Sequence, residues 1–128
     1  MRKRAIITAG IAMTFVGALA LSQVPTDEDP VKISPQLYEV RFENDRVRVL
    51  EYRLKPGETE PMHSHPPGVV HYLSDATFRT TLPDGTVSDA SVKKGDVGWR
   101  DFTRHAARNI GSTEAHAMAI ELKSSSSD

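Results

Sequence analysis

The chain has 128 residues, a length typical of one domain, with a formal net charge of −1 and no cysteine. It therefore cannot be stabilised by disulfides. A chain of this charge without a basic stripe is a poor nucleic-acid binder, so no nucleic-acid partner is expected. The sequence contains no phosphate-binding loop, CxxC motif or Ser-His-Asp arrangement, which leaves nucleotide and nucleophilic chemistry unsupported.

The first 24 residues have the pattern of an export signal. The basic start "MRKR" precedes a long uncharged run that ends in small residues, as in a secretory signal peptide. Residues 5–24 are also long enough to cross a bilayer, which takes roughly 20 residues as a helix. Residues 1–22 are thus predicted as a cleaved signal peptide or an N-terminal anchor. Both readings predict a periplasmic or secreted domain, attached to the membrane through residues 1–24 only if the signal stays uncleaved.

The rest of the chain reads as one folded unit with flexible ends. Residues 23–36 are predicted as a linker because three prolines stand among acids, and residues 124–128 as a flexible, serine-rich tail. Between them, residues 37–123 show short strand-like segments separated by turns. Strands are predicted at residues 37–42, 46–54, 69–74, 76–82, 87–92, 105–110 and 115–122.

Two of these segments need comment. Within residues 46–54, Val47 and Val49 alternate against Arg46 and Arg48, which places these arginines on the outer face. The alternation changes phase near Val49 and Leu50, which indicates a bulge. Residues 115–122 are rich in helix-forming residues, but their alternation favours a strand. The many short strands, joined by turns such as "PDGT" and "KKGD", predict an all-β sandwich or small barrel.

A pair of histidines in "PMHSHP" carries the main chemical signal. On a strand, His63 and His65 would point the same way, and imidazole is a common metal ligand. A third ligand would have to come from another strand, and His105 is the candidate. The alternative is that the three histidines are unrelated surface or core residues.

The spacing around these histidines resembles the cupins, most closely small single-domain bacterial members. Gly57, five residues and His-x-His resemble the first cupin motif, and Gly95 followed by His105-x3-Asn109 resembles the second. The resemblance covers roughly residues 37–123. It implies a conical β-barrel (a double-stranded β-helix or jelly roll) that brings His63, His65 and His105 to one interior point. It also implies a structural role for Asn109, and turn positions for Gly57, Gly95 and Gly111.

One departure affects the expected metal site. The glutamate of the first motif would fall at Val69 or Val70, so the usual fourth ligand is missing. Thiol dioxygenases and a diketone dioxygenase among the cupins use three histidines, and the resemblance implies a divalent metal, with iron(II) favoured. By ligand type, zinc, nickel, copper or manganese would also fit. Such a site suits an anionic small-molecule substrate, and metal binding should weaken as pH falls through about 6.5, where free histidine titrates.

Further polar and aromatic residues lie near the motifs. Most are expected at the surface, each with a functional alternative: a replacement carboxylate at Glu58 or Glu60, a ligand at His71, an inward-facing group at His116, and anion binding at Arg100 and Arg104. Tyr52 and Tyr72 are expected to pack, with lining of the barrel cavity as the alternative. Trp99 is expected to pack within the domain or at a subunit interface.

Three functions remain open at this point. The first is a metal-dependent oxygenase acting on a small organic molecule, and the second is a metal- or ligand-binding module without turnover. The third is a degenerate barrel that serves as a dimer scaffold. A homodimer is expected in each case, because a small core without disulfides buries little surface, with residues 37–42 as the candidate edge strand.

Overall fold

The computed structural model describes residues 27–125 as one short helix and nine β-strands. In chain order the elements are α1 (Pro30–Ile33), β1 (Tyr38–Glu43), β2 (Val47–Leu54), β3 (Thr59–His65), β4 (Gly68–Tyr72), β5 (Ala76–Thr81), β6 (Val87–Val92), β7 (Val97–Arg100), β8 (Thr103–Asn109) and β9 (Ala115–Leu122). The predicted signal peptide and the last three residues of the predicted tail lie outside the described residues.

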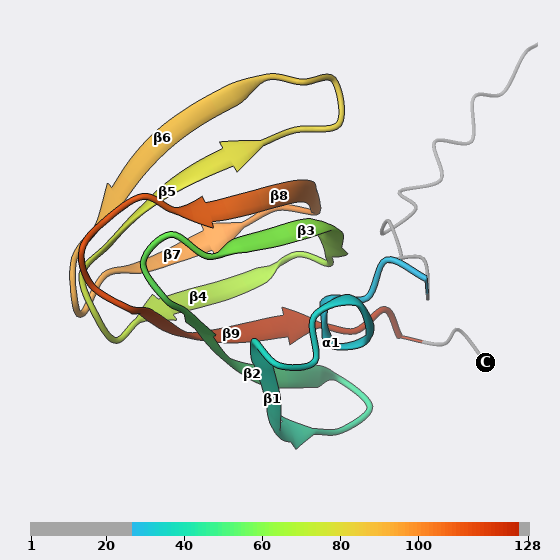
Figure 1. The fold of residues 1–128 in the computed structure, drawn as a ribbon. Helices are drawn as coiled ribbons and strands as arrows, with labels where there is room; N and C mark the ends of the chain where they lie inside the picture. The colour runs from blue at the N-terminus through green and yellow to red at the C-terminus, as the bar shows by residue number, and fades with distance from the viewer. Residues whose placement is uncertain (1–26, 126–128) are drawn as a thin grey trace, which may run out of the picture.

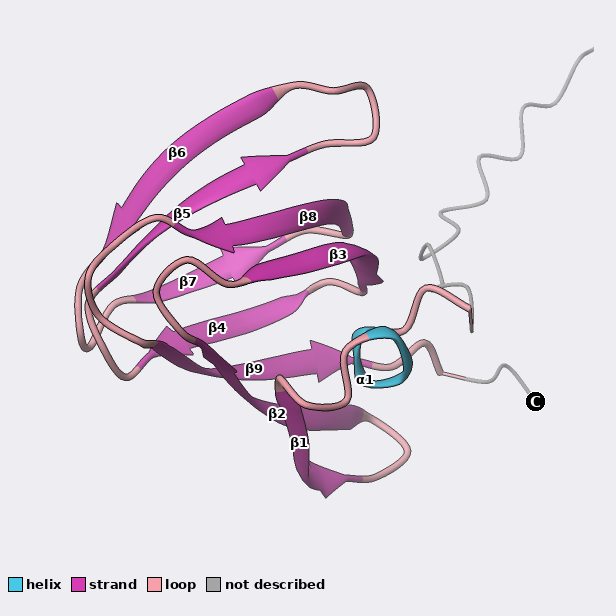
Figure 2. Cartoon of the chain, viewed as in Figure 1, coloured by secondary structure: helices cyan, strands magenta, loops and turns pink. Residues whose placement is uncertain are grey.

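The strands form two antiparallel sheets that face each other (Figures 1 and 2). One has the order β1-β2-β9-β4-β7 and the other the order β3-β8-β5-β6. The all-β prediction is confirmed, and β1 lies at a sheet edge as expected for residues 37–42. Homodimer formation through that edge stays a prediction.

Strand β9 shows why the alanine-rich segment is not a helix. Ala115, Ala117 and Ala119 are buried, whereas the residues between them are only partly buried. This period of two matches a strand with one face inside. Since β9 lies between β2 and β4, its small side chains leave room in the interior that bulky ones would fill.

The apolar core lies between the two sheets. Leu50 and Leu54 are fully buried and cluster with Leu37, Tyr38 and Ala115. Helix α1 packs against β1 and β3, with Asp29 as its N-cap: the carboxylate accepts from Val31 N at 3.0 Å.

The predicted bulge in residues 46–54 is wrong for this strand. Strand β2 pairs with β9 in unbroken register from Val47 to Leu54, and the irregularity lies across from it on β1, between Val40 and Phe42. The phase of β2 does not change, because Arg48 faces inward together with Leu50. The sequence interpretation placed this arginine outside; ion pairs hold it inside, as the next section describes.

Two further segments differ from the sequence expectations. Strand β7, Val97–Arg100, was not predicted. It has only four residues, and with a glycine and an arginine among them it shows no clear alternation of apolar and polar side chains. The described part of the predicted linker, residues 27–36, packs on the domain. The Glu28 carbonyl accepts from Ser64 N at 2.9 Å, and its carboxylate accepts from Arg104 Nε at 2.7 Å.

Turns fall where the sequence indicated them. Gly85 in the β5–β6 hairpin and Gly95 before β7 have φ of 86° and 93°, a region that favours glycine. Gly57 shares this conformation with φ of 80°, whereas Gly111 does not.

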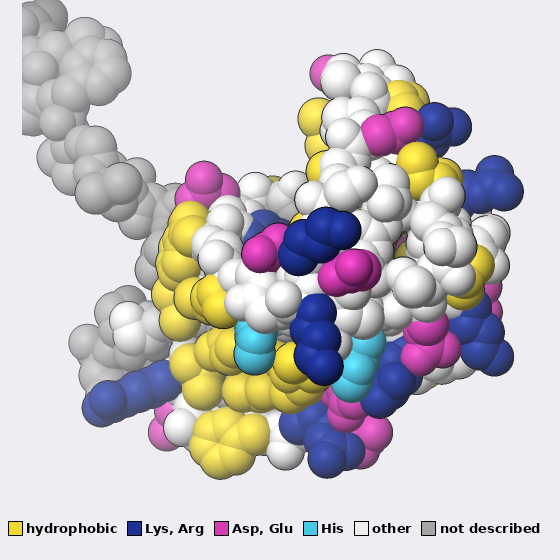
Figure 3. Space-filling model, turned by 90° about the vertical axis from the view of Figure 1, so that its left-hand side faces the viewer, with side chains coloured by type: hydrophobic (Ala, Val, Ile, Leu, Met, Phe, Trp, Pro, Cys, Tyr) yellow, Lys and Arg dark blue, Asp and Glu magenta, His cyan; other side chains and the backbone are white. Residues whose placement is uncertain are grey.

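The surface mixes both signs of charge. On the face drawn in Figure 3, basic and acidic side chains are interspersed, and apolar side chains gather toward the lower left of the view. Within residues 27–125, no helix is long and apolar enough to cross a membrane.

Gly68 marks the closest approach between two strands. A Cβ built at Gly68 on β4 would lie 2.1 Å from the Ile120 carbonyl oxygen on β9, far inside van der Waals contact. Gly98, on the neighbouring strand β7, has nothing within 4 Å of the same position. The two glycines therefore give a matched pair.

We predict that Gly68→Ala lowers the free energy of unfolding by more than about 2 kcal/mol, since the methyl group forces two backbones apart. Gly98→Ala should change it by less than about 1 kcal/mol, in the stabilising direction. Urea denaturation of the full-length variants measures both. Equal midpoints for the two variants would contradict the close approach of β4 and β9.

Candidate metal centre

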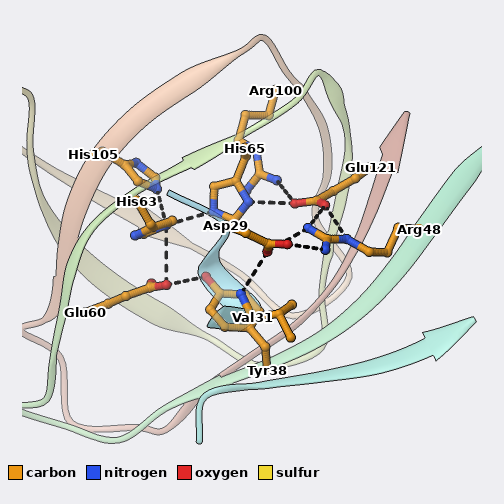
Figure 4. Close-up of polar contacts among 10 residues, drawn as sticks. All are labelled: Asp29, Val31, Tyr38, Arg48, Glu60, His63, His65, Arg100, His105 and Glu121. Atoms are coloured by element: carbon orange, nitrogen blue, oxygen red, sulfur yellow. Dashed lines mark hydrogen bonds and ion pairs between the residues drawn. The ribbon is translucent and has the colours of Figure 1, made fainter. Parts of the chain in front are cut away.

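Three histidine side chains meet inside the barrel (Figure 4). His63 and His65 come from β3, and His105 comes from β8, directly across from His63 in the register. The Nε2 atoms of His63 and His65 are 2.8 Å apart, and that of His105 lies 3.1 Å from His63 Nε2. One nitrogen from each ring lies within 4.8 Å of the others. The structure thus brings together all three residues that the sequence singled out.

A β-bulge adds a carboxylate to this cluster. Between Glu60 and His63 the register shifts: Glu60 faces Ala107 and His63 faces His105, so β3 has one residue more than β8. Strict alternation would turn Glu60 away from His63, but the extra residue brings both to the interior. Glu60 is 1% exposed, and its Oε1 lies 3.3 Å from His63 Nε2.

The hydrogen bonds of the rings define which nitrogens carry lone pairs. His63 Nδ1 lies 2.7 Å from the Pro61 carbonyl oxygen, which can only accept, so Nδ1 carries the proton. His65 Nδ1 lies 2.8 Å from Glu121 Oε1 and donates in the same way. The Nε2 atoms of both rings therefore carry lone pairs that face each other. A cation bound between them would remove the repulsion between these lone pairs.

A chain of ion pairs holds His65 in this orientation. Arg48 donates to Glu121 Oε2 from Nε at 3.0 Å and from Nη2 at 2.8 Å, which leaves Oε1 for His65. Asp29 in turn accepts from both terminal nitrogens of Arg48, at 2.8 and 3.1 Å. Metal-binding histidines commonly donate their second nitrogen to a carboxylate or a carbonyl group, as His65 and His63 do here.

Burial keeps the three imidazoles neutral. Desolvation lowers the pKa of His63 to about 4 and that of His105 to about 3, and it places that of His65 well below its usual range. The nearby Arg100 guanidinium acts in the same direction on all three. The pH dependence near 6.5 that free histidine side chains predict therefore does not apply to this site.

Glu60 titrates near neutral pH instead. Burial raises its pKa to about 7, against hydrogen bonds from Tyr38 and Tyr52 that favour the carboxylate. The Tyr38 hydroxyl donates to Glu60 Oε1 at 2.5 Å, and burial raises the pKa of this phenol well above its usual range. A neutral donor thus supports a carboxyl group that can hold or release a proton beside the histidines.

The cluster borders a cavity of about 170 Å³. His65, His105 and Glu60 line it on the polar side, and its other walls are largely aromatic and aliphatic. Arg100 on β7 also lines it. An engineered apolar cavity of roughly 150 Å³ accepts benzene, so this space suits a molecule of that size.

Other candidates from the sequence lie elsewhere. His71 does not belong to the cluster: it lies on β4 next to Val70, which is buried and lines the cavity. His116 does not belong to it either, and its Nε2 pairs with Glu51 at 2.7 Å. Glu58 is exposed and accepts from Lys55 N in a turn. The apolar wall at Val70 replaces the glutamate that the resemblance implied at Val69 or Val70.

The remaining residues show mixed outcomes. Arg104 is part-exposed and paired with Glu28, as a surface arginine would be, and Asn109 is fully buried with its amide on two carbonyl groups. Trp99 is 58% exposed and does not pack inside the domain. Tyr52 and Tyr72 line the cavity, where they serve as wall.

Sequence reasoning missed three buried charged residues of the interior. Glu60 was expected at the surface, which is wrong because the bulge turns it inward. Pro61 could have indicated the bulge, since proline within a sheet is found at edge strands and bulges. Glu121 continues the inward alternation of the alanines on β9. Arg100 was expected in solvent, which is wrong because it ends the unrecognised strand β7 with its side chain in the cavity.

Comparison with known proteins rests on structure. No family model and no curated protein matches the sequence. A cupin-domain protein of Bordetella pertussis Tohama I is similar with a TM-score of 0.63 and 27% identity, over 69% of this chain and 93% of its own.

Two more distant structures show similarity of fold. A double-stranded β-helix protein of Klebsiella pneumoniae has a TM-score of 0.55 at 19% identity, over 81% of this chain and 84% of its own. An RmlC-like cupin of Methanocaldococcus jannaschii has a TM-score of 0.54 at 18% identity, over 67% and 78%. The resemblance seen in the sequence is confirmed, and the cluster of His63, His65 and His105 fits a divalent metal site. From its fold and these neighbours, we conclude that the chain belongs to the cupin superfamily.

Proposed function

We propose that the protein binds a divalent metal ion through His63, His65 and His105 and acts on a small organic molecule in the adjoining cavity. The observation that supports this most strongly is the pair of Nε2 lone pairs 2.8 Å apart, in rings whose Nδ1 atoms are already engaged. Iron(II) is the favoured ion, and oxygenation the favoured reaction, both on the likeness to three-histidine cupins.

The chain itself supplies the surroundings for such chemistry. When bound, a divalent ion would polarise a small molecule beside it, and iron(II) would add redox chemistry with dioxygen. Glu60 is placed to exchange a proton at the same point, since its carboxyl group lies 3.3 Å from His63 Nε2. The apolar wall opposite excludes water from the reacting molecule.

Binding without turnover is the second candidate. The same imidazole geometry supports it, since nothing in that geometry requires a reaction. Oxygen consumption by the iron(II)-loaded protein with small acids, thiols or dicarbonyl compounds separates the two. Export through residues 1–22 and assembly as a homodimer also stay predictions.

The first prediction here concerns metal content. Replacing His63, His65 or His105 singly by alanine should reduce the bound metal per chain sharply, because each change removes one of three donors from a neutral set. His71→Ala and His116→Ala should reduce it little, since both side chains lie outside the cluster. Elemental analysis of full-length protein purified without a nickel column gives the stoichiometry. Full metal retention in His105→Ala would overturn the three-histidine site.

The second prediction concerns protons. Below pH 7 the imidazoles are already neutral while Glu60 is protonated, so metal binding near pH 6 should displace about one proton, from Glu60. Metal affinity should then weaken by up to about tenfold per pH unit as pH falls below 7. Calorimetry in buffers of different ionisation enthalpy counts the protons.

Glu60→Gln provides the control. It keeps the size of the side chain and removes the titrating group, so the proton count near pH 6 should fall to about zero. Release of two or more protons from the wild-type protein would mean that the histidines are protonated before the metal binds. That result would contradict their burial as neutral rings.

A further inference from the structure

Arg100 is a largely buried cation whose ion-pair partner in the described part of the chain, Glu121, lies too far away to accept a hydrogen bond from it. Its Nε and Nη2 atoms are both shielded from solvent and make no hydrogen bond. The side chain comes from the end of β7 and lines the same cavity as His65 and His105 (Figure 4). Buried charges are normally paired, because an unpaired one forfeits its hydration without compensation.

The carboxylate beside Arg100 is already taken. Glu121 Oε1 lies 3.9 Å from Arg100 Nη2, beyond hydrogen-bond distance, and accepts from His65 Nδ1 at 2.8 Å. Its other oxygen accepts twice from Arg48, which Asp29 pairs in turn. The hydrogen-bonding capacity of the Asp29 and Glu121 carboxylates is therefore used by Val31, Arg48 and His65, and the Nε and Nη2 donors of Arg100 stay free.

The charge of the site with its metal favours the same kind of ligand. Glu60 is the acid that lines the cavity, and its Oε1 already accepts from the Tyr38 hydroxyl at 2.5 Å. A metal ion on three neutral imidazoles would add two positive charges. An anion is thus the ligand that the electrostatics favour.

The shape of the cavity limits the rest of the ligand. Its volume of about 170 Å³ holds a molecule of roughly benzene size. Phe78, Val92 and Tyr72 form an apolar part of its wall. The planar fork of a guanidinium group matches a carboxylate, with which it forms two parallel hydrogen bonds.

We propose that the cavity binds a small organic monocarboxylate, with its carboxylate on Arg100 and its apolar part against Phe78 and Val92. The inference rests on the proposed function in one respect, that the ligand lies beside the metal held by the histidines. It names the class of that molecule. The anchoring group is Arg100, which acts with or without the metal.

The test compares acids with their neutral amides. Acetate, propionate, isobutyrate and benzoate, each with the matching amide, are titrated calorimetrically into full-length protein, both metal-free and loaded with zinc, which is redox-silent. At least one acid should bind ten- to a hundredfold more tightly than its amide, the range expected for charge-assisted hydrogen bonds. If no acid exceeds its amide in either state, the inference is overturned.

Variants assign the preference to Arg100. Arg100→Gln should abolish the preference for the acid, and Arg100→Lys should keep part of it. Arg79→Gln, at an arginine on β5 whose side chain is 51% exposed and paired with Asp89, should leave it unchanged. A preference that survives in Arg100→Gln would also overturn the proposal. If Arg100→Gln does not fold, the wild-type comparison and Arg100→Lys still decide the question.

Two more readouts separate this inference from the metal proposal. Metal content should be the same in Arg100→Gln as in the wild-type protein, since no histidine changes. Its ligand-free melting temperature should be equal or higher, because a guanidinium group with two buried, unsatisfied donors is removed. A purely structural role for Arg100 would lower it. If the protein prefers acids but binds no metal, only the metal proposal is overturned. If it binds metal but shows no preference for acids, only the carboxylate proposal is overturned.

Discussion

The β-bulge between Glu60 and His63 is the constraint on which the site depends. Without it, β3 would present its histidines to the interior and its glutamate to the opposite face. With it, three polar side chains from one seven-residue strand converge, and β8 adds only His105. The bulge also frees the Pro61 carbonyl, which fixes the tautomer of His63. Position, protonation state and orientation of the donors therefore share one local irregularity of the backbone.

The charged residues of the interior form two groups, one fully paired and one only partly paired. Asp29, Arg48 and Glu121 are mutually paired, and the set ends on His65, so its bonds are complete. Glu60 and Arg100 are not ion-paired in this way, and both border the cavity. The hydration that these two groups lose on folding is not fully replaced by contacts within the protein. Such uncompensated burial is expected where a protein keeps groups ready for a ligand, and the apolar core around Leu50 and Leu54 offsets its cost.

Much of this architecture could be predicted from the sequence, and the failures share a cause. Alternation identified most strands, and the His-x-His spacing identified a shared face, because both depend on a period of two. His105 was only a candidate from its place on a late strand until the resemblance implied it as the third ligand, since sequence distance says nothing about which strands pair. Arg48 and Arg100 were assigned to solvent because polar residues usually are. Alternation along one strand cannot reveal a register shift, which is what places Glu60 in the interior. It also cannot reveal an ion-pair partner on a distant strand, which is what holds Arg48 there.

The bulged strand also affects how the protein behaves toward other copies of itself. Strand β3 lies at the edge of its sheet, where unpaired backbone groups can recruit a strand from another chain and start aggregation. Pro61 lacks an N–H group and the bulge distorts the first half of this edge, while the Glu28 carbonyl occupies Ser64 N in the second half. A proline that helps to position the histidine cluster on one side thus blocks strand addition on the other. The same few residues determine both the geometry of the cluster and the protection of this edge, so a substitution among them affects both.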